Sequence, residues 1–463
     1  MELNKKIDEM KEELIKAVQE IVKIKSIQEE EKPGMPFGEG VAKTLDKALE
    51  VAASLGFHTY KEEGGYYGYA EYGEGQDYVA VLGHMDVVPE GDNWIYPPYG
   101  AEIHEGKIFG RGTLDDKSPT IAALFGLKAI KDLKIPLSKK VRIIFGTNEE
   151  TGCSEMHVYN KKEKAPLCGF TPDAMYPLIN AEKGIKRFHV VKKLNSYNCE
   201  TMIKSLKGGM RPNMVPDKCE TVIAAKDMES IVKAVKQFAD EKGYNMKTEI
   251  VNDKLVLHTF GVGAHGSIPE LGKNAIMQTF DFLGTISKGT CPLADYISFF
   301  NKYIGFETDG TSLKIACEDQ ASGKLSLNVG VAEINEDMAD LWIDMRHPVT
   351  VKGEQIMDTL SKKFAECGAK IERVQTDEPL YFPEDSELVK TLLKVYNAQT
   401  GEEGKAYGVG GGTYAKELLN IIGFGPIFPG KPDLDHQANE YIEVEDLIMN
   451  AKIYAHAIYE LAK

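Results

Sequence analysis

The stretch YVAVLGHMDVVP, residues 78–89, constrains the fold of this chain more than any other. Its first five residues are typical of a buried β-strand, and Gly83 follows them directly. His84 and Asp86 then stand two positions apart, before a proline turns the chain. Because α/β proteins carry their chemistry at the carboxyl ends of their strands, this stretch predicts an α/β fold with a functional site at the strand end.

Length and charge limit the possible functions. With 463 residues, the chain is long enough for two or three domains. Its formal net charge of −16 argues against nucleic acid or an anionic membrane as a partner. The charged, amphipathic N-terminal segment lacks the apolar core of a signal peptide, and no apolar run is long enough to cross a bilayer, so we expect a cytoplasmic protein. The seven cysteines are scattered and form no CxxC pair, which argues against a disulfide framework and a thiolate zinc site.

The pattern of strands and helices changes twice along the chain. Residues 1–183 and 379–463 combine buried strands with amphipathic helices, whereas residues 184–378 have alternating strands and helices of the α+β type. The sequence therefore predicts a discontinuous α/β domain with a central mixed sheet, interrupted by an inserted α+β domain. Helices are expected at 3–24, 41–55, 228–240, 353–367, 386–400 and from Val444, with a further helix capped by Ser118; strands are expected at 141–145, 185–191, 248–257, 325–334, 339–345 and 421–428.

Polar side chains that could hold metal ions follow several of these strands and loops. They are His84, Asp115 and Asp116 in GRGTLDDKSP, Glu149 and Glu150 in GTNEETG, Asp173 in TPDAMYP, and His436 in DLDHQANE. Each residue on its own could have an ordinary structural role. A lone histidine is usually a surface or core residue, and an acidic pair is usually solvated or caps a helix. A purely structural role for all of them is less convincing, because acidic pairs directly follow apolar strands and the histidines lie in Gly/Pro-rich turns.

Together these residues predict a site for divalent metal ions. Histidine and carboxylate ligands without cysteine suit zinc, manganese or cobalt. Three carboxylates, Asp115, Glu150 and Asp173, against two divalent cations leave one positive charge, which favours two ions with a bridging hydroxide and a carbonyl oxygen. Glu149 is then the carboxylate left over to act as general base.

Six motifs resemble, in their order along the chain, a known family. LGHMDVVP, GRGTLDDKSP, GTNEETG, TPDAMYP, GGGTYA and DLDHQANE are similar to those of the co-catalytic metallopeptidases that include glutamate carboxypeptidase, aminoacylase, carnosinase and succinyl-diaminopimelate desuccinylase. The long insert is most similar to that of bacterial PepV-type dipeptidases, which are Xaa-His dipeptidase or carnosinase-like enzymes. The resemblance implies a two-domain metallopeptidase in which residues 1–183 and 379–463 bind the metal and residues 184–378 form a lid domain.

The resemblance also implies a role for each candidate ligand. His84 and Asp173 would hold one ion, Glu150 and His436 the other, and Asp115 would bridge the two. Zinc is the first expectation for both ions, with manganese or cobalt as alternatives.

Two further acidic residues would assist the metal ligands. Glu149 matches the general acid/base of the family, and Asp86 matches the residue that accepts the other ring proton of His84 and fixes its tautomer. The peptide bond after the bridging aspartate is commonly cis in this family, which would make Asp115–Asp116 a non-proline cis bond.

Four residues of the central and C-terminal parts resemble substrate-binding positions. Asn213 lies in MRPNMVPD, His265 in GVGAHGSIPELGKNA and Arg346 in IDMRHPV, and Gly411 lies in a glycine-rich run. Arg346 could clamp a substrate carboxylate and His265 could stabilise an oxyanion, although an ordinary ion pair and an ordinary loop histidine remain open. The enlarged lid implies that one chain supplies its own histidine, hence a monomer.

The function expected from the sequence is a metal-dependent dipeptidase. It would hydrolyse dipeptides with a free N-terminus, including the β-Ala-His type, by a metal-activated water with Glu149 as base. One alternative is an N-acyl-amino-acid amidohydrolase of the same family, such as a deacylase or a desuccinylase. The alternative from another class is a non-catalytic binding homologue, which would usually have lost metal ligands or the base.

Overall fold

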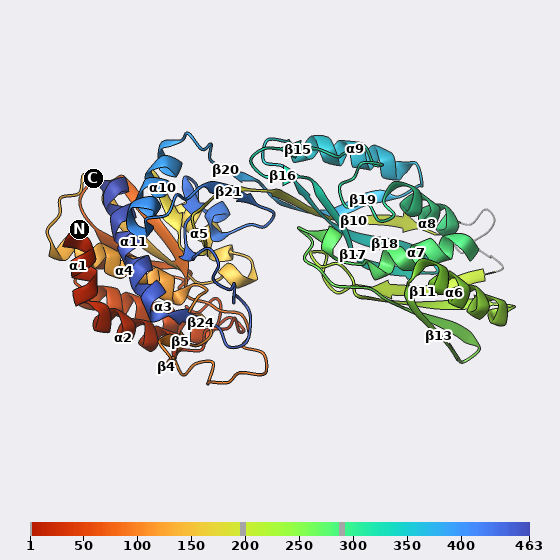
Figure 1. Cartoon of the computed structure of the whole chain (residues 1–463), viewed down its shortest axis with the longest axis horizontal. Coiled ribbons are helices and arrows are strands. Elements are labelled where there is room, and N and C mark those ends of the chain that lie inside the picture. Colours follow the sequence, from red (N-terminus) through yellow and green to blue (C-terminus); the bar gives the residue numbers. More distant parts are fainter. Residues whose placement is uncertain (1, 195–200, 287–291) are drawn as a thin grey trace. The chain divides into compact units, whose positions relative to one another are not determined.

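The chain folds into two compact units, each built around its own apolar core (Figure 1). The computed structural model describes residues 2–194, 201–286 and 292–463. The first unit comprises Met1–Asn180, Tyr381–Tyr407 and Gly412–Lys463, and the second comprises Ala181–Leu380 with Gly408–Gly411. The two-domain α/β fold with an inserted α+β domain is confirmed. The structure adds that the short segment Gly408–Gly411 contacts the inserted unit.

The first unit contains a mixed sheet. Its strands lie in the order β1 (His58–Lys61), β2 (Gly68–Tyr72), β6 (Lys140–Gly146), β3 (Tyr78–His84), β7 (Cys168–Thr171), β22 (Ile421–Gly423), β9 (Leu178–Glu182) and β20 (Leu380–Tyr381), with β21 (Ala406–Val409) beside β9. β3 runs parallel to β6 and β7, and β1 and β2 pair antiparallel. The helices of this unit are α1 (Glu2–Glu9), α2 (Lys11–Val22), α3 (Glu39–Ser54), α4 (Lys117–Asp132), α5 (Ser154–Lys162), α10 (Glu387–Thr400) and α11 (Val444–Ala462).

Smaller elements complete this unit. One short sheet joins β4 (Glu102–His104), β5 (Lys107–Phe109) and β24 (Tyr441–Glu443), and another pairs β8 (Ala174–Met175) with β23 (Pro426–Ile427). Two 3₁₀ turns, η1 (Glu149–Thr151) and η3 (Tyr414–Glu417), follow strands of the main sheet.

The strand predicted at residues 78–82 is the buried centre of the main sheet. All seven residues of β3 are buried, and the strand lies between β6 and β7. A β-carbon on Gly83 would lie only 1.8 Å from Oγ1 of Thr120 and 2.5 Å from Oδ2 of Asp116. A side chain therefore cannot be accommodated at Gly83, which lets α4 approach the end of the strand.

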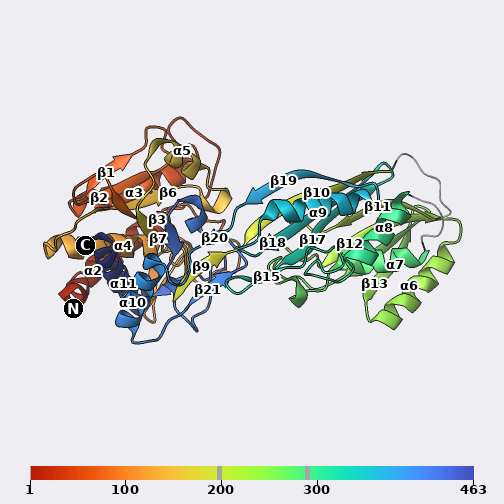
Figure 2. The same ribbon diagram turned by 90° about the horizontal axis from the view of Figure 1, so that it is seen from above.

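The second unit is an eight-stranded antiparallel sheet with helices along it (Figure 2). The strand order is β13 (Asn245–Val251), β14 (Lys254–Phe260), β12 (Lys218–Ala225), β11 (Thr201–Gly208), β17 (Ser326–Asn335), β18 (Met338–His347), β10 (Gly184–Lys193) and β19 (Lys370–Asp377). The helices are α6 (Met228–Lys242), α7 (Ala275–Ile286), α8 (Pro292–Tyr303) and α9 (Gly353–Ala365), and the short elements are η2 (Pro269–Leu271), β15 (Glu318–Asp319) and β16 (Gly323–Lys324). This antiparallel sheet with helices is the predicted α+β pattern.

Some predicted elements were wrong in detail. The helix expected at 3–24 is two helices, because the chain leaves helical geometry at Met10. The single strand expected at 248–257 is the hairpin β13–β14, which turns at Asn252 and Asp253 with positive φ angles of 48° and 57°. The strand expected at 421–428 is divided into β22 and β23 around Gly425.

Two further expectations failed or were incomplete. Ser118 does not cap α4, because the helix already begins at Lys117 with Asp116 at the N-cap position. The Ser118 hydroxyl is buried without a hydrogen-bond partner among the described residues. Helices α5, α7 and α8 were not predicted at all. Of the cysteines, Cys199 and Cys291 lie outside the described residues.

Candidate metal centre

The main sheet brings the candidate ligands of the first unit to one edge. β3, β6 and β7 are parallel, so their carboxyl ends meet there. His84 is the last residue of β3, Glu149 and Glu150 form η1 just after β6, and Asp173 follows β7. The register pairs His84 with Gly146, which brings the acidic turn close to the imidazole.

Asp115 lies between the two histidines. Its Oδ1 is 2.8 Å from Nε2 of His84, and its Oδ2 is 3.2 Å from Nε2 of His436. The same His436 nitrogen is 2.9 Å from Oε2 of Glu150. One carboxylate therefore contacts both imidazoles, one through each oxygen. The structure thus brings together His84, Asp115, Glu150 and His436, although the chain separates the first and last by most of its length.

Two overlapping groups of side chains could each hold a metal ion. Ligand atoms of His84, Glu149 and Asp173 lie within 4.8 Å of one another, and so do those of His84, Asp115 and Glu150. The structure therefore collects Asp173 at the same edge of the sheet as the other carboxylates. It also puts Glu149, expected to be the base, beside His84 and Asp173.

Burial and mutual repulsion make the carboxylates of the cluster hard to ionise. Burial, reinforced by the charge of Asp173, holds the pKa of Glu149 well above its ordinary value. Burial and Asp115 raise the pKa of Glu150 to about 7 and that of Asp173 to about 6. Burial and Asp115 also raise the pKa of Asp435, the neighbour of His436, to about 10. These groups would bind a cation in preference to remaining as charges close together.

The histidines act in the opposite direction on Asp115. Burial alone would raise the pKa of this carboxyl, but hydrogen bonds from His436 and His84 lower it below its ordinary value. In return, Asp115 and Glu150 raise the pKa of His436 to about 11. Positive charge beside Asp115 therefore favours its ionised form, as a bound cation would.

Asp86 supports both the imidazole and the acidic turn. Its Oδ1 accepts a hydrogen bond from the backbone N–H of Glu149 and its Oδ2 one from that of Glu150, both at 3.2 Å. Nδ1 of His84 lies 3.1 Å from the backbone oxygen of Asp86 and 3.4 Å from its carboxylate. Asp86 therefore fixes the positions of Glu149 and Glu150 in addition to the expected contact with His84.

Glu440 is a buried residue that the sequence analysis missed. Its carboxylate accepts hydrogen bonds from the backbone N–H groups of Gly112, Leu114 and Asp115. It also forms an ion pair with Arg111 at 2.7 Å, and both side chains are almost fully buried. Glu440 thus holds the loop that carries Asp115. Its place as the last residue of DLDHQANE, a motif already assigned to the site, was the signal that could have found it.

The peptide bond between Asp115 and Asp116 is cis, as the family resemblance implied. The carboxylate of Asp116 accepts a hydrogen bond from the backbone N–H of His84 at 3.3 Å and one from Oγ1 of Thr120 at 2.8 Å. Asp115 faces the two histidines while Asp116 faces the end of β3. The two neighbouring aspartates therefore have different surroundings and different functions in the loop.

The residues expected to bind substrate all lie in the second unit. The backbone oxygen of Asn213 accepts a hydrogen bond from Gly266, next to His265, at 2.7 Å. Arg346 is buried; its Nε donates to Asp344 at 2.9 Å and its Nη1 to the backbone oxygen of Gly410 at 2.6 Å. A β-carbon on Gly411 would meet no atom of the described residues within 4 Å.

His265 is held as a neutral imidazole of defined tautomer. Burial and the nearby charge of Arg346 lower its pKa. Ser267 donates to Nδ1 of His265 through its backbone N–H at 3.4 Å, and the Ser267 hydroxyl lies 2.6 Å from the same nitrogen. Since Nδ1 is the acceptor, the ring proton is on Nε2, where it can be donated to a ligand.

The side chains at the edge of the main sheet fit a divalent metal ion. They supply imidazole nitrogen and carboxylate oxygen, the donor set of zinc and manganese sites. Several carboxylates are buried against one another, with raised pKa values, and Oδ1 atoms of Asp116 and Asp435 are buried without a hydrogen-bond partner in the described part of the chain. A cation would relieve this repulsion, so the described site is suited to bind metal.

Comparisons with known proteins identify the family of this chain. Residues 80–460 match the family model described as "Peptidase family M20/M25/M40". The chain is 41% identical over 462 residues to the protein named "Putative dipeptidase YtjP" of Bacillus subtilis (strain 168), with 98% of each chain covered. No helix in residues 2–194, 201–286 or 292–463 is both long and apolar enough to cross a bilayer.

Solved structures share the fold at low sequence identity. Human carnosine dipeptidase 1 is 15% identical with a TM-score of 0.57, over 99% of this chain and 98% of that one. Aminoacylhistidine dipeptidase from Vibrio alginolyticus is 13% identical with a TM-score of 0.59, over 97% and 96% of the two chains. The family model covers far more than half of the sequence and the Bacillus relative nearly all of it, so this chain belongs to peptidase family M20/M25/M40.

Proposed function

We propose that this chain is a metal-dependent dipeptidase that hydrolyses dipeptides with a free N-terminus, including the β-Ala-His type. The observation that carries the proposal is the contact of Asp115 with both His84 and His436, beside an acidic turn that holds Glu149 and Glu150. The relatives named as dipeptidases support the choice of substrate class. The first unit would bind the metal and the second would bind substrate as a lid.

Two divalent metal ions are proposed for the cluster. His84 and Asp173 would hold one and Glu150 and His436 the other, with Asp115 shared between them. The contact of each Asp115 oxygen with a different histidine supports the shared position. Bound ions would supply Lewis-acid polarisation of the substrate carbonyl and a lower pKa for the attacking water. Zinc is the first candidate, with manganese or cobalt as alternatives, because the donor set suits all three.

Glu149 is the proposed general base and acid. Its backbone N–H donates to Asp86, which holds the turn that carries this side chain. Burial and the charge of Asp173 raise its pKa, which is the direction that suits a group that takes up a proton and later returns it. Glu149 takes a proton from the attacking water and later gives it to the leaving amine.

Residues of the second unit are proposed to recognise the substrate. His265 donates its Nε2 proton to the oxyanion, and the contacts of Ser267 with Nδ1 support this tautomer. Arg346 binds the substrate carboxylate, and Asn213 and the backbone of Gly411 approach the substrate beside it. Two nitrogens of Arg346 are already hydrogen-bonded to Asp344 and Gly410, which fixes the direction of the guanidinium. We propose a monomer, in which one chain supplies all of these residues.

A substrate panel tests the proposal against its nearest rival. Metal-free protein is assayed with Ala-Ala and β-Ala-His, and with N-acetyl and N-succinyl amino acids, after Zn²⁺ or Mn²⁺ is restored. The dipeptidase predicts turnover of the free dipeptides only, and only with metal. Turnover of the N-acyl compounds alone would favour an amidohydrolase, and metal binding without any turnover would favour a non-catalytic homologue.

A further inference from the structure

Asn213 and His265, which the proposed function assigns to the substrate, lie on two short segments that pair with each other. The backbone oxygen of Asn213 accepts a hydrogen bond from the N–H of Gly266 at 2.7 Å. Met214 and His265 form an antiparallel bridge beside this bond. An element that fixes Asn213 therefore also fixes the backbone of His265. The two paired segments, called the ribbon below, are residues 213–215 and 264–266.

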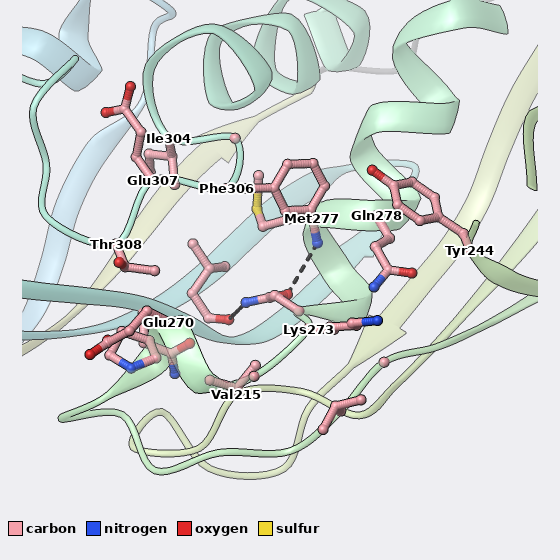
Figure 3. A pocket seen from close by; sticks show the side chains of 18 of the residues that line it. Val215, Tyr244, Glu270, Lys273, Met277, Gln278, Ile304, Phe306, Glu307 and Thr308 are labelled. Atoms are coloured by element: carbon pink, nitrogen blue, oxygen red, sulfur yellow. Dashed lines mark hydrogen bonds between the residues drawn. The ribbon is translucent and has the colours of Figure 1, made fainter. Parts of the chain in front are cut away.

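A pocket of about 660 Å³ lies beside the ribbon (Figure 3). Val215 of the ribbon lines it, together with Val262 and Lys273, which are joined by two backbone hydrogen bonds of 2.8 and 2.9 Å. Figure 3 shows Val215 and Lys273 among the side chains around this space. Because a cavity supplies no packing contacts to its walls, the hydrogen bonds that reach the ribbon matter more for its position.

Asn328 of β17 supplies two such hydrogen bonds. Its side-chain Nδ2 donates to the backbone oxygens of Pro212 and Met214, both at 2.8 Å. These two acceptors are the residues directly before and after Asn213 in the chain. Since Asn328 is only 2% exposed, water does not compete for the bonds, and loss of the amide would leave buried carbonyl groups unpaired.

The backbone of β17 also contacts the loop that leads into the ribbon. The register of β17 against β18 shifts at Gly330. A β-carbon on Gly330 would lie only 2.2 Å from the backbone oxygen of Pro212 and 2.5 Å from its Cα. The loop thus rests directly on the strand, which leaves little room for it to shift while the bonds from Asn328 are intact.

The strand next to β17 carries the third residue that the proposed function assigns to the substrate. The register of β17 on β18 pairs Asn328 with Asp344, which stands two positions before Arg346. Asp344 accepts a hydrogen bond from Nε of Arg346 at 2.9 Å. Asn328 therefore ties the neighbours of Asn213 to the same pair of strands that holds Arg346.

We propose that Asn328 is a positioning residue for substrate recognition, which holds Asn213, and through the ribbon His265, in a fixed place relative to Arg346. This inference rests on the proposed function, which assigns these three residues to the substrate. Asn328 acts through them and does not touch the reacting atoms. Its loss should weaken substrate binding, through Asn213, and lower turnover, through the oxyanion donor His265.

Asn328→Leu in the zinc-loaded full chain tests the kinetic effect, because leucine keeps the volume of the side chain and removes its amide. We expect kcat/KM for Ala-Ala to fall on the order of 10²-fold, since a misplacement of about 1 Å in a substrate-positioning group can cost that much. KM should rise and kcat should fall together. Bound zinc should be unchanged, because the ligand cluster lies in the first unit.

Asn335→Leu is the matched control, at the opposite end of β17. The side chain of Asn335 also makes two hydrogen bonds to the backbone, since its Oδ1 accepts from the N–H groups of Asp337 and Met338, both at 2.9 Å. The control thus removes an equal number of bonds from the same strand without touching the ribbon. It should leave both kcat and KM unchanged.

Hydrogen exchange followed by mass spectrometry separates a change of position from a general loss of stability. The N–H groups of Gly266 and Val215 donate within the ribbon, to Asn213 and Ala264. Peptides that contain them should exchange on the order of tenfold faster in Asn328→Leu, while peptides of β18 keep their protection. Asn328→Ala is the second variant, because the space that it leaves admits water to the two carbonyl groups and reduces the cost to folding. It should show the same changes to a smaller degree.

Three results would overturn the positioning role. They are unchanged exchange of the ribbon in both Asn328 variants, faster exchange with unchanged kcat and KM, and an equal loss of kcat in Asn335→Leu. Failure of the proposed function gives a different result, because the unchanged chain would then not hydrolyse Ala-Ala. The exchange measurement needs no substrate, so it decides in either case whether Asn328 holds the ribbon.

Discussion

At the scale of single residues, Glu149 and Glu150 are neighbours in one turn but have different partners. Oε2 of Glu150 contacts His436, whereas Glu149 lies beside His84 and Asp173 and has a strongly raised pKa. We predict that Glu149→Gln, and equally Glu149→Ala, lowers kcat on Ala-Ala by a factor on the order of 10²–10⁴ while the bound metal is retained. Steady-state kinetics and metal analysis of the same sample measure both quantities.

The matched control for this variant is Glu63→Gln, at an exposed turn of the same unit. It should keep both turnover and metal. Near-normal turnover in Glu149→Gln, or loss of its metal, would remove Glu149 from the role of general base.

Glu440 is expected to act on the metal through the loop that it holds. Its carboxylate binds three backbone N–H groups around Asp115, and a neutral amide cannot accept all of these bonds while also pairing with Arg111. We predict that Glu440→Gln weakens metal affinity by about 10- to 100-fold, the usual effect of losing a group that orients a ligand. Competition with a chromophoric chelator gives the affinity.

Glu445→Gln, an exposed position in the first turn of α11, is the control and should bind metal normally. If Glu440→Gln binds metal as tightly as the unchanged protein, the loop around Asp115 does not depend on this carboxylate.

Substitution of His265 should lower kcat more than substitution of its neighbour Ser267. We predict that His265→Ala lowers kcat without loss of metal, and that Ser267→Ala has a smaller effect, because it frees the ring to adopt the other tautomer. Since the pKa of His265 is lowered, the neutral imidazole should persist below pH 6.5, and its protonation should not limit activity at neutral pH. A pH profile of kcat for both variants measures this, and an unchanged kcat in His265→Ala would contradict the role.

At the scale of elements, the spacing of apolar residues predicted regular helices and strands but missed the places where they are interrupted. The buried strand at 78–82 and the helix beginning at Val444 were expected, and both exist. The division at Met10 was not visible, because apolar residues keep helical spacing across it. The hairpin at Asn252–Asp253 was missed because strand-like residues continue on both sides of a two-residue turn.

The same limits apply to the site. The residues expected as metal ligands lie together at one edge of the sheet, because motifs that end strands or form loops carry chemical information. Glu440 was missed although it lies in one of the motifs, because its role depends on hydrogen bonds to a loop more than three hundred positions earlier. The sequence also does not show which residues would bind the same ion, because this depends on distances between their side-chain atoms.

The packing of α4 against α11 depends on a glycine. A β-carbon on Gly126 would lie 2.8 Å from the backbone nitrogen of Ala455 and 3.1 Å from its Cα. Although alanine is the better helix former by about 1 kcal/mol, we predict that Gly126→Ala lowers the free energy of unfolding by about 1–3 kcal/mol, because the backbone of α11 must move. Urea denaturation measures the change.

Gly411→Ala is the comparison, because a β-carbon there would have space on all sides in the part of the chain that the structure describes. It should leave stability within about 0.5 kcal/mol of the unchanged protein. Equal stability of Gly126→Ala and Gly411→Ala would show that α4 and α11 can separate without cost.

At the scale of the whole molecule, the two units have separate cores, and the candidate metal ligands found among the described residues all lie in the first. Metal removal should therefore destabilise the first unit alone, since a ligand stabilises only the folded region that binds it. An ion present at a thousand times its Kd contributes about 4 kcal/mol. Without it, the carboxylates near His84 repel one another again.

We predict that chelation of zinc accelerates hydrogen exchange in β3 and η1 and lowers the melting temperature of the first unit, while β17 and β18 of the second unit keep their protection. Zinc added back should restore both. His436→Ala should show a smaller response to zinc, whereas His258→Ala, which removes a histidine paired with Glu249 on the second sheet, should respond normally. An equal loss of protection in both units would mean that metal binding and the stability of the second unit are coupled, and no change in either would exclude the cluster as the principal metal site.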